Sequence, residues 1–221
     1  MKINTKKGLS KKNFILQSKT DSKSGLEEFT DEILQEYRKS NNAFFVLERI
    51  GESGLPGFDE QFRIITKRAF NSLEIVRHIL NHEKITETYI CVYSIDFKSA
   101  LVLDYLAKEE KLGNVTFLIS NLRNSAHSEK EAAVRRLFLK NPKMRLIFAG
   151  SHAKLLLFKT NSNNYYVIET SANMASNSRI EQYLFENNEK SYKFHKNWID
   201  NVYNIASERE LSIYDYSGEK I

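Results

Sequence analysis

The sequence has little cysteine, proline and glycine, and it lacks long apolar runs. Its 221 residues include one Cys, two Pro and eight Gly, which excludes collagen-like and low-complexity chains. The single thiol, Cys91, has no partner for an internal disulfide, and its place in the apolar run YICVYSI indicates a core residue rather than a nucleophile. No stretch of about 18 apolar residues occurs. We therefore expect no membrane-spanning helix and, without a secretory signal, a cytoplasmic protein.

Positive charge is gathered in the first 25 residues. The formal net charge is +5, yet residues 1–25 alone hold seven Lys and one Asp, so the remaining chain is close to neutral. A basic segment of this kind attracts anionic partners such as nucleic acid, but it serves as often as a solubilising tail. Charge therefore gives only weak support for nucleic-acid binding by the folded part of the chain.

The order of apolar and polar segments divides the chain into four parts. We predict a basic flexible arm over residues 1–25, a helical N-terminal extension over 26–80, an α/β domain over 81–205 and a C-terminal tail over 206–221. Within the extension, apolar residues recur at helical spacing over 26–42 and again from Phe58 to Leu80. The segment between them, AFFVLERI, fits either a short strand or a helix.

Residues 81–205 alternate between strand-like and helix-like patterns. Nearly continuous apolar runs predict strands at 86–95, 115–120 and 144–150, separated by helical patterns at 97–114 and 128–141. Extended segments follow in HAKLLLF, YYVIETS and SRIEQYLFEN, and KSYKFHKNWIDNVYNIA is helical. Buried strands that alternate with helices are typical of a sheet covered on both sides. We therefore predict an α/β fold with a mixed β-sheet flanked by helices on both faces.

Polar side chains stand at the ends of two strands that we expect to form a hairpin. His152 and Lys154 are two residues apart, so they project to the same side of an extended chain. Ser171 and Asn173 repeat this spacing at the exit of the second strand, and a turn at NSNN would bring the two ends together. With Glu181 from the next extended segment, the group offers donors for a phosphate, an imidazole that attacks phosphorus or carries a proton, and a carboxylate.

These residues resemble the signature of the phospholipase D superfamily. That signature runs His-x-Lys, four residues, Asp, about six more residues and Gly-Ser-x-Asn, with a later Glu or Gln. The matching positions are His152, Lys154, Ser171, Asn173 and Glu181. The strand and helix order over 86–148 is also similar to the family's core, so the resemblance covers roughly residues 86–205.

The resemblance implies a two-step chemistry on phosphodiesters. One His attacks phosphorus and forms a phosphohistidine, while a second His protonates the leaving oxygen and then activates water. By this resemblance the catalytic residues are His152, Lys154, Asn173 and Glu181, and no metal or other cofactor is required. We expect Ser171, Ser94 and Arg123 to contribute to substrate binding, the last two because they follow strands that end beside the site.

The chain carries one His-x-Lys in a matching context, whereas the family's mechanism needs two. The short single-copy members are nucleases that complete the site across a dimer two-fold. The resemblance therefore implies a homodimer with two copies of His152 near the axis, acting as a metal-independent nuclease on DNA or RNA and without a membrane partner.

Two positions depart from the family pattern and keep alternatives open. Lys159 stands where the family has Asp, and Thr170 stands where it has Gly. Loss of the Asp does not imply loss of activity, whereas Thr170 removes a permissive backbone position and is expected to narrow access near the phosphate. One alternative is a catalytically degenerate subunit for nucleic-acid binding or assembly. The other is a phospholipid hydrolase, which the lack of a membrane segment or amphipathic anchor disfavours.

Three further residues have patterns that favour ordinary structural interpretations. His78 and His82 are four apart, as in a zinc pair, but the residues between them lack the Glu of a metalloprotease motif, so we predict a solvated helix end. Trp198 lies at helical spacing with other apolar residues and is predicted to be part of the core.

Overall fold

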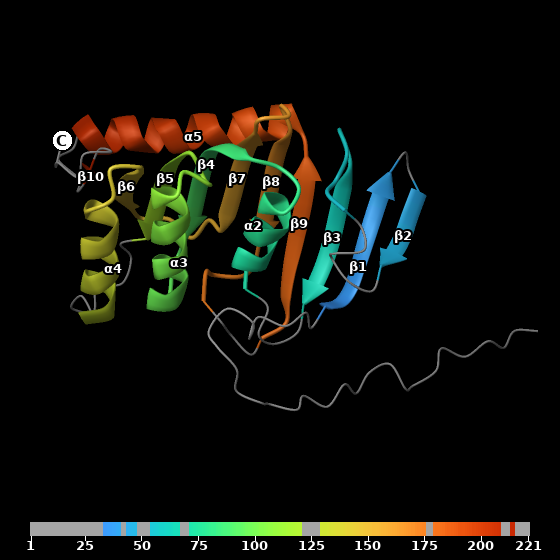
Figure 1. The fold of residues 1–221 in the computed structure, drawn as a ribbon, viewed down its shortest axis with the longest axis horizontal. Helices are drawn as coiled ribbons and strands as arrows, with labels where there is room; N and C mark the ends of the chain where they lie inside the picture. The colour runs from blue at the N-terminus through green and yellow to red at the C-terminus, as the bar shows by residue number, and fades with distance from the viewer. Residues whose placement is uncertain are drawn as a thin grey trace, which may run out of the picture.

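The chain is built around one ten-stranded sheet (Figure 1). The computed structural model describes residues 33–40, 43–47, 54–66, 71–120, 129–175, 179–208 and 213–214. Its elements are, in chain order, β1 (Ile33–Ser40), β2 (Ala43–Leu47), β3 (Gln61–Thr66), α2 (Leu73–Leu80), β4 (Ile85–Val92), α3 (Phe97–Lys108), β5 (Asn114–Ser120), α4 (Glu129–Leu139), β6 (Met144–Ala149), β7 (Leu155–Thr160), β8 (Tyr165–Thr170), β9 (Glu181–Asn187), α5 (Glu189–Glu208) and β10 (Ile213–Tyr214).

The sheet is mixed and is covered on both sides. Its strand order is β10-β6-β5-β4-β7-β8-β9-β3-β1-β2. Strands β4, β5 and β6 are parallel, and the other neighbouring pairs are antiparallel. Helices α2, α3 and α4 lie on one face, and the long helix α5 crosses the other (Figure 1). The predicted α/β fold, a mixed sheet with helices on both faces, is confirmed.

Strand β4 shows why the central strands are apolar along their whole length. Ile90 and Val92 pack into the cluster that includes α2, α3 and α4, whereas Tyr89 and Cys91 pack into the cluster that includes α5. Side chains of both parities are therefore buried, as expected for a strand between two helical layers. Cys91 is fully buried, and burial raises the pKa of its thiol, so its assignment to the core is confirmed.

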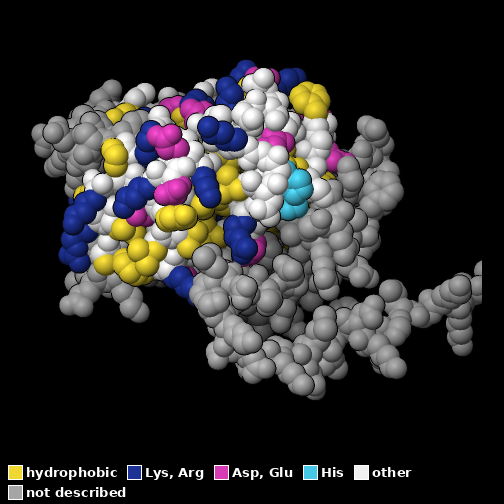
Figure 2. Space-filling model, viewed as in Figure 1, with side chains coloured by type: hydrophobic (Ala, Val, Ile, Leu, Met, Phe, Trp, Pro, Cys, Tyr) yellow, Lys and Arg dark blue, Asp and Glu magenta, His cyan; other side chains and the backbone are white. Residues whose placement is uncertain are grey.

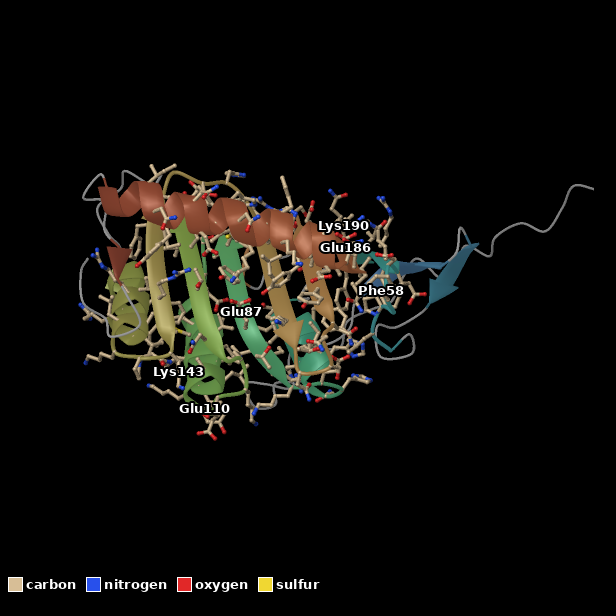
Figure 3. The ribbon with its side chains drawn as sticks, turned by 90° about the horizontal axis from the view of Figure 1, so that it is seen from above. Phe58, Glu87, Glu110, Lys143, Glu186 and Lys190 are labelled. Atoms are coloured by element: carbon tan, nitrogen blue, oxygen red, sulfur yellow. The ribbon has the colours of Figure 1, made fainter. Side chains whose placement is uncertain are left out.

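An ionic cluster fastens α5 to the sheet at Glu87 on β4 (Figure 3). The Lys196 amine donates to Glu87 Oε1 at 2.6 Å and also to the Tyr89 hydroxyl, and the Tyr192 hydroxyl donates to Glu87 Oε2 at 2.7 Å. Burial by itself raises the pKa of Glu87, but the hydrogen bonds from Lys196 and Tyr192 and the charges of Lys196 and Lys159 outweigh it. The pKa of this carboxyl is therefore lowered.

The hairpin expected around NSNN is present. Strands β7 and β8 pair antiparallel from Leu155 opposite Glu169 to Lys159 opposite Tyr165. In the turn, Asn163 has a φ of +59°, a left-handed conformation that Asn tolerates better than most residues. The hairpin register therefore places the start of β7 beside the end of β8.

The N-terminal extension is not the helical segment that the apolar spacing predicted. The helix expected over 26–42 is contradicted by β1. Within the segment 58–80, expected to be one long helix, residues 61–66 form β3 and residues 73–80 form α2. In β3, Phe62, Ile64 and Thr66 are buried while Arg63 is exposed, which is the two-residue period of a strand. Strand β3 pairs with β9, so this region extends the same sheet. The basic arm, residues 1–25, lies outside the described residues.

The surface over α2, α3 and α4 mixes charges of both signs with one apolar stripe. Figure 2 shows hydrophobic side chains gathered over α3, where Phe97, Leu101 and Tyr105 are exposed at successive turns. Among the helices of the described residues, none has the length and apolar character to cross a membrane.

Candidate active site

The predicted site residues that the structure describes lie along one edge of the sheet. Strand β4 ends where β7 begins, with Cys91 opposite Leu155, and β8 ends where β9 begins, with Thr170 opposite Tyr183. The segments that leave β4 and β8 therefore meet the segments that enter β7 and β9. This edge also holds the carboxyl ends of the parallel strands, where open α/β sheets bind their ligands.

His152 and Lys154 lie together just before β7. The Lys154 amine is 3.3 Å from His152 Nδ1 and 3.3 Å from the His152 carbonyl oxygen. The backbone pairing continues past the strand, because Thr170 N donates to the Lys154 carbonyl at 3.1 Å. The imidazole is exposed, and its ring centroid lies 5.0 Å from that of Tyr93 at the end of β4. The two side chains therefore project to the same side, as their spacing predicted.

Asn173 is fixed to the exit of β4. Its Oδ1 accepts from Ser94 N at 3.2 Å, and beside it Asp96 N donates to the Met174 carbonyl at 3.0 Å. Because the Asn173 oxygen takes part in this contact, its amide N–H groups are the donors that remain for a phosphate oxygen. Ser94 was expected to bind substrate, and the contact it makes here is a backbone one that positions Asn173.

Ser171 and Glu181 form a second internal contact at this edge. The Ser171 hydroxyl donates to Glu181 Oε2 and accepts from Gln182 N at 3.1 Å. Glu181 is 9% exposed, so its carboxylate depends on partners within the protein. Ser171 was expected to bind the phosphate, but in this geometry its hydroxyl holds Glu181 in place. Both residues were expected at the site, but their spacing does not indicate this direct bond.

Lys159, the first departure from the family pattern, lies far from this edge. It stands at the other end of β7, roughly 16 Å from Lys154 along the strand at about 3.3 Å per residue. Its amine lies 5.5 Å from the centroid of the Tyr165 ring, and its charge helps to lower the pKa of Glu87. Lys159 therefore belongs to the surroundings of the ionic cluster under α5.

Thr170, the second departure, sits in regular strand geometry. Among the described residues, those with positive φ are Gly54, Asp59, Glu110, Gly113 and Asn163, so position 170 does not need the freedom of glycine. The Thr170 hydroxyl accepts from Ala172 N at 2.9 Å and hydrogen-bonds Tyr183. Burial above all raises the pKa of Tyr183 to about 12. Thr170 thus stabilises the turn that carries Ser171 and Asn173.

The remaining sequence predictions concern residues away from this site or outside the described part of the chain. Arg123 lies outside the described residues. His78 is buried rather than solvated, since its Nε2 donates to the Gly54 carbonyl at 2.8 Å, and burial lowers its pKa. Within the part of the chain that the structure describes, no cluster of His, Cys, Asp or Glu has the make-up of a metal site.

Comparison with known proteins gives matches in structure but not in sequence. No family model matches the chain, and no curated protein matches it. Nuc from Salmonella typhimurium, described as a phospholipase D family member, is 16% identical over 60% of this chain and 86% of Nuc, with a TM-score of 0.46. This likeness is one of structure, at low sequence identity.

Two larger proteins show a similar level of likeness. Phosphatidylserine synthase from Haemophilus influenzae is 9% identical over 73% of this chain and 42% of its own, with a TM-score of 0.47. Polyphosphate kinase from Porphyromonas gingivalis is 12% identical over 62% of this chain and 25% of its own, with a TM-score of 0.47. This chain therefore spans less than half of either protein. These structural likenesses do not extend to substrate or activity.

Proposed function

We propose that the protein is a phosphodiesterase of the phospholipase D type. The observation that carries the proposal is the His152–Lys154 pair, whose amine and imidazole lie 3.3 Å apart at an exposed strand edge. Asn173 is anchored beside Tyr93, the residue that packs on the His152 ring. An ammonium, an amide and an imidazole on one edge are the groups that bind and attack a phosphate.

Substrate binding changes the state of the imidazole. In the free protein the Lys154 ammonium faces His152 Nδ1, which therefore accepts, and the neutral ring carries its proton on Nε2. An anionic phosphate oxygen is a better partner for the ammonium than a ring nitrogen is. When Lys154 turns to that oxygen, Nδ1 takes up the ring proton and Nε2 gains the lone pair that attacks.

The reaction then proceeds through a covalent intermediate. The Nε2 lone pair of His152 forms a bond to phosphorus, and the bond from phosphorus to the leaving oxygen breaks as that oxygen takes a proton from a second imidazole. Water next attacks phosphorus, gives its proton to the second imidazole and releases His152. A positioned acid contributes about 10²- to 10⁴-fold in rate. Lys154 and Asn173 each contribute up to about 3 kcal/mol by donating to the developing negative charge.

The second imidazole comes from another copy of the chain. We propose a homodimer in which the partner subunit's His152 protonates the leaving group, as the single His-x-Lys in a matching context implies by resemblance. Sedimentation at micromolar concentration should then give twice the monomer mass of 25.8 kDa. A sample that contains monomer alone and still cleaves phosphodiesters would contradict this arrangement.

The proposed substrate is nucleic acid, DNA or RNA, cut without a metal ion. Its support is the basic segment at residues 1–25, which is complementary to a phosphate backbone, together with the resemblance to single-copy nucleases. Single- and double-stranded DNA and RNA should therefore be incubated with the protein in EDTA. Cleavage is expected, and protein that cuts none of these and no small phosphodiester would overturn the proposal.

The chain offers a matched control for His152. His82 and Lys84 also form a His-x-Lys, but they precede β4 and lie at the opposite edge of the sheet from Asn173. His152→Ala should abolish cleavage, whereas His82→Ala should retain it. Binding of nucleic acid without cleavage by the wild type, and equally by His152→Ala, would favour a degenerate binding or assembly subunit. Release of headgroups from liposomes without nuclease activity would favour a phospholipid hydrolase.

A further inference from the structure

A cleft of about 540 Å³ adjoins the proposed phosphate site on the α5 side of the sheet. Lys154 and Ser171 line it at the edge where the phosphate is proposed to bind. Three other polar residues line the cleft: Arg63 from β3, Glu169 from β8 and His195 from α5. The size lies within the range of small-molecule sites, and the cleft shares Lys154 with the proposed phosphate site.

Hydrogen bonds tie the wall formed by α5 to the sheet. Trp198 Nε1 donates to His195 Nδ1 at 3.0 Å, so Nδ1 accepts and the neutral ring carries its proton on Nε2. That nitrogen lies 3.0 Å from Glu169 Oε1 on β8 and donates to it. The chain of contacts ties α5 to the sheet and fixes both rings. These two aromatic rings therefore present fixed surfaces to a ligand.

The lining combines flat apolar surfaces with donors and acceptors. Trp198 and His195 supply aromatic rings, and Ile65 and Leu184 supply aliphatic surface. Arg63 is a donor, Glu169 is an acceptor and Gln182 is both. A nucleobase has the complementary form, with two apolar faces and an edge of donors and acceptors, and proteins stack bases on aromatic rings and on Arg. An acyl chain has no polar edge for these groups to pair with.

We propose that this cleft binds the nucleobase next to the scissile phosphate, an inference that rests on the proposed function and specifies its substrate. A base that enters the cleft must leave its stack, which is easiest for single strands. The cleft therefore selects single-stranded over double-stranded nucleic acid.

Trp198 is the single tryptophan of the chain, so its fluorescence reports on the cleft. The full-length protein should be titrated with adenosine, cytidine and their 5′-monophosphates, and with ribose 5-phosphate and inorganic phosphate as probes without a base. Nucleosides should change the Trp198 emission saturably, and His152→Ala should bind them as well as the wild type. The two probes without a base should give no saturable change.

Variants of the lining test the assignment residue by residue. Arg63→Ala and Glu169→Gln should each weaken nucleoside binding by about five- to 100-fold, the range for losing one base contact. Glu169 is half-exposed, so Glu169→Gln should fold even if Arg63→Ala does not. Arg77→Ala, an exposed arginine on α2, is the matched control and should bind like the wild type.

The outcomes separate this inference from the proposed function. Phosphodiester cleavage without a saturable response to nucleosides would overturn the base-binding cleft and leave the enzyme activity standing. A response to nucleosides without cleavage would support the cleft and remove the activity. An equal response to ribose 5-phosphate, or unchanged affinity in Glu169→Gln, would overturn the assignment of the cleft to a base.

Discussion

Replacing Ser171 with Ala tests whether its hydroxyl holds Glu181 in place or binds substrate. In the structure, the hydroxyl donates to Glu181 Oε2 and accepts from Gln182 N. Glu181 is 9% exposed, so water replaces the lost donor poorly, whereas Gln182 is exposed and its N–H can turn to solvent. The loss is therefore dominated by the carboxylate. A hydrogen bond to a charged group contributes about 1.5–3 kcal/mol.

We expect Ser171→Ala to lower the free energy of unfolding by about 2 kcal/mol and the Tm by about 4–8 °C. Urea and thermal unfolding measure both quantities. Ser162→Ala is the matched control, because Ser162 is exposed in the turn at the other end of the same hairpin. Its effect should stay within about 0.5 kcal/mol.

A double-mutant cycle identifies the partner. In a Glu181→Gln background the neutral amide needs the hydroxyl less, so Ser171→Ala should cost about 1 kcal/mol less than in the wild type. Additive effects of the two substitutions, or a Ser171→Ala protein as stable as the Ser162→Ala control, would show that the hydroxyl does not hold the carboxylate. Ser171 would then again be assigned to substrate binding.

Three other predictions follow from the ionic cluster and from His78. Lys159→Asp introduces the residue of the family signature but places a carboxylate near Glu87. The free energy of unfolding should therefore fall by about 0.5–1 kcal/mol, while the cleavage rate stays unchanged. A tenfold faster rate would refute the position given to Lys159. Lys196→Met should cost about 1–2 kcal/mol in urea unfolding, since the pair it breaks is about 30% exposed. Because the pKa of Glu87 is lowered from 4.5, that difference should be present above pH 4.5 and shrink as the pH falls below it; a difference that grows in acid would contradict the pairing. Burial lowers the pKa of His78 from 6.5, so the unfolded chain binds a proton first and stability should drop as the pH falls below 6.5. His78→Gln should flatten this drop, and an unaltered pH profile would count against a buried neutral imidazole.

The edge that carries the candidate site could be predicted because its determinants are local. The short turn between β7 and β8 fixes which ends of the strands meet, and the two-residue spacing of His152 and Lys154 fixes a shared side. The apolar character of β4, β5 and β6 likewise predicted a sheet buried on both faces. These features needed no knowledge of distant contacts.

The N-terminal strands could not be predicted because their pattern fits two periods. Phe62 and Ile65 are three apart, as on a helix, while Phe62 and Ile64 are two apart, as on a strand. The partner strand β9, more than 100 residues later, decides between these readings. Propensity within the segment does not contain that information.

The cleft and the true surroundings of the two departures also depend on long-range packing. Glu169 and His195 meet because α5 crosses the sheet, although 26 residues separate them. Alternate side chains of β7 face α5, and Lys159 is one of them. It stands at the end of the strand away from the site. A signature read along the chain gives the order of residues and not the direction from which each one reaches a site.

The central claim is that His152, Lys154 and Asn173 surround one tetrahedral anion. A crystal structure of the full-length protein with vanadate tests it most directly. We predict vanadium bonded to His152 Nε2, with the Lys154 amine and the Asn173 amide nitrogen donating to its oxygens at about 2.7–3.2 Å. Vanadate bound elsewhere on the protein, or at this edge without contact to His152, would contradict the account.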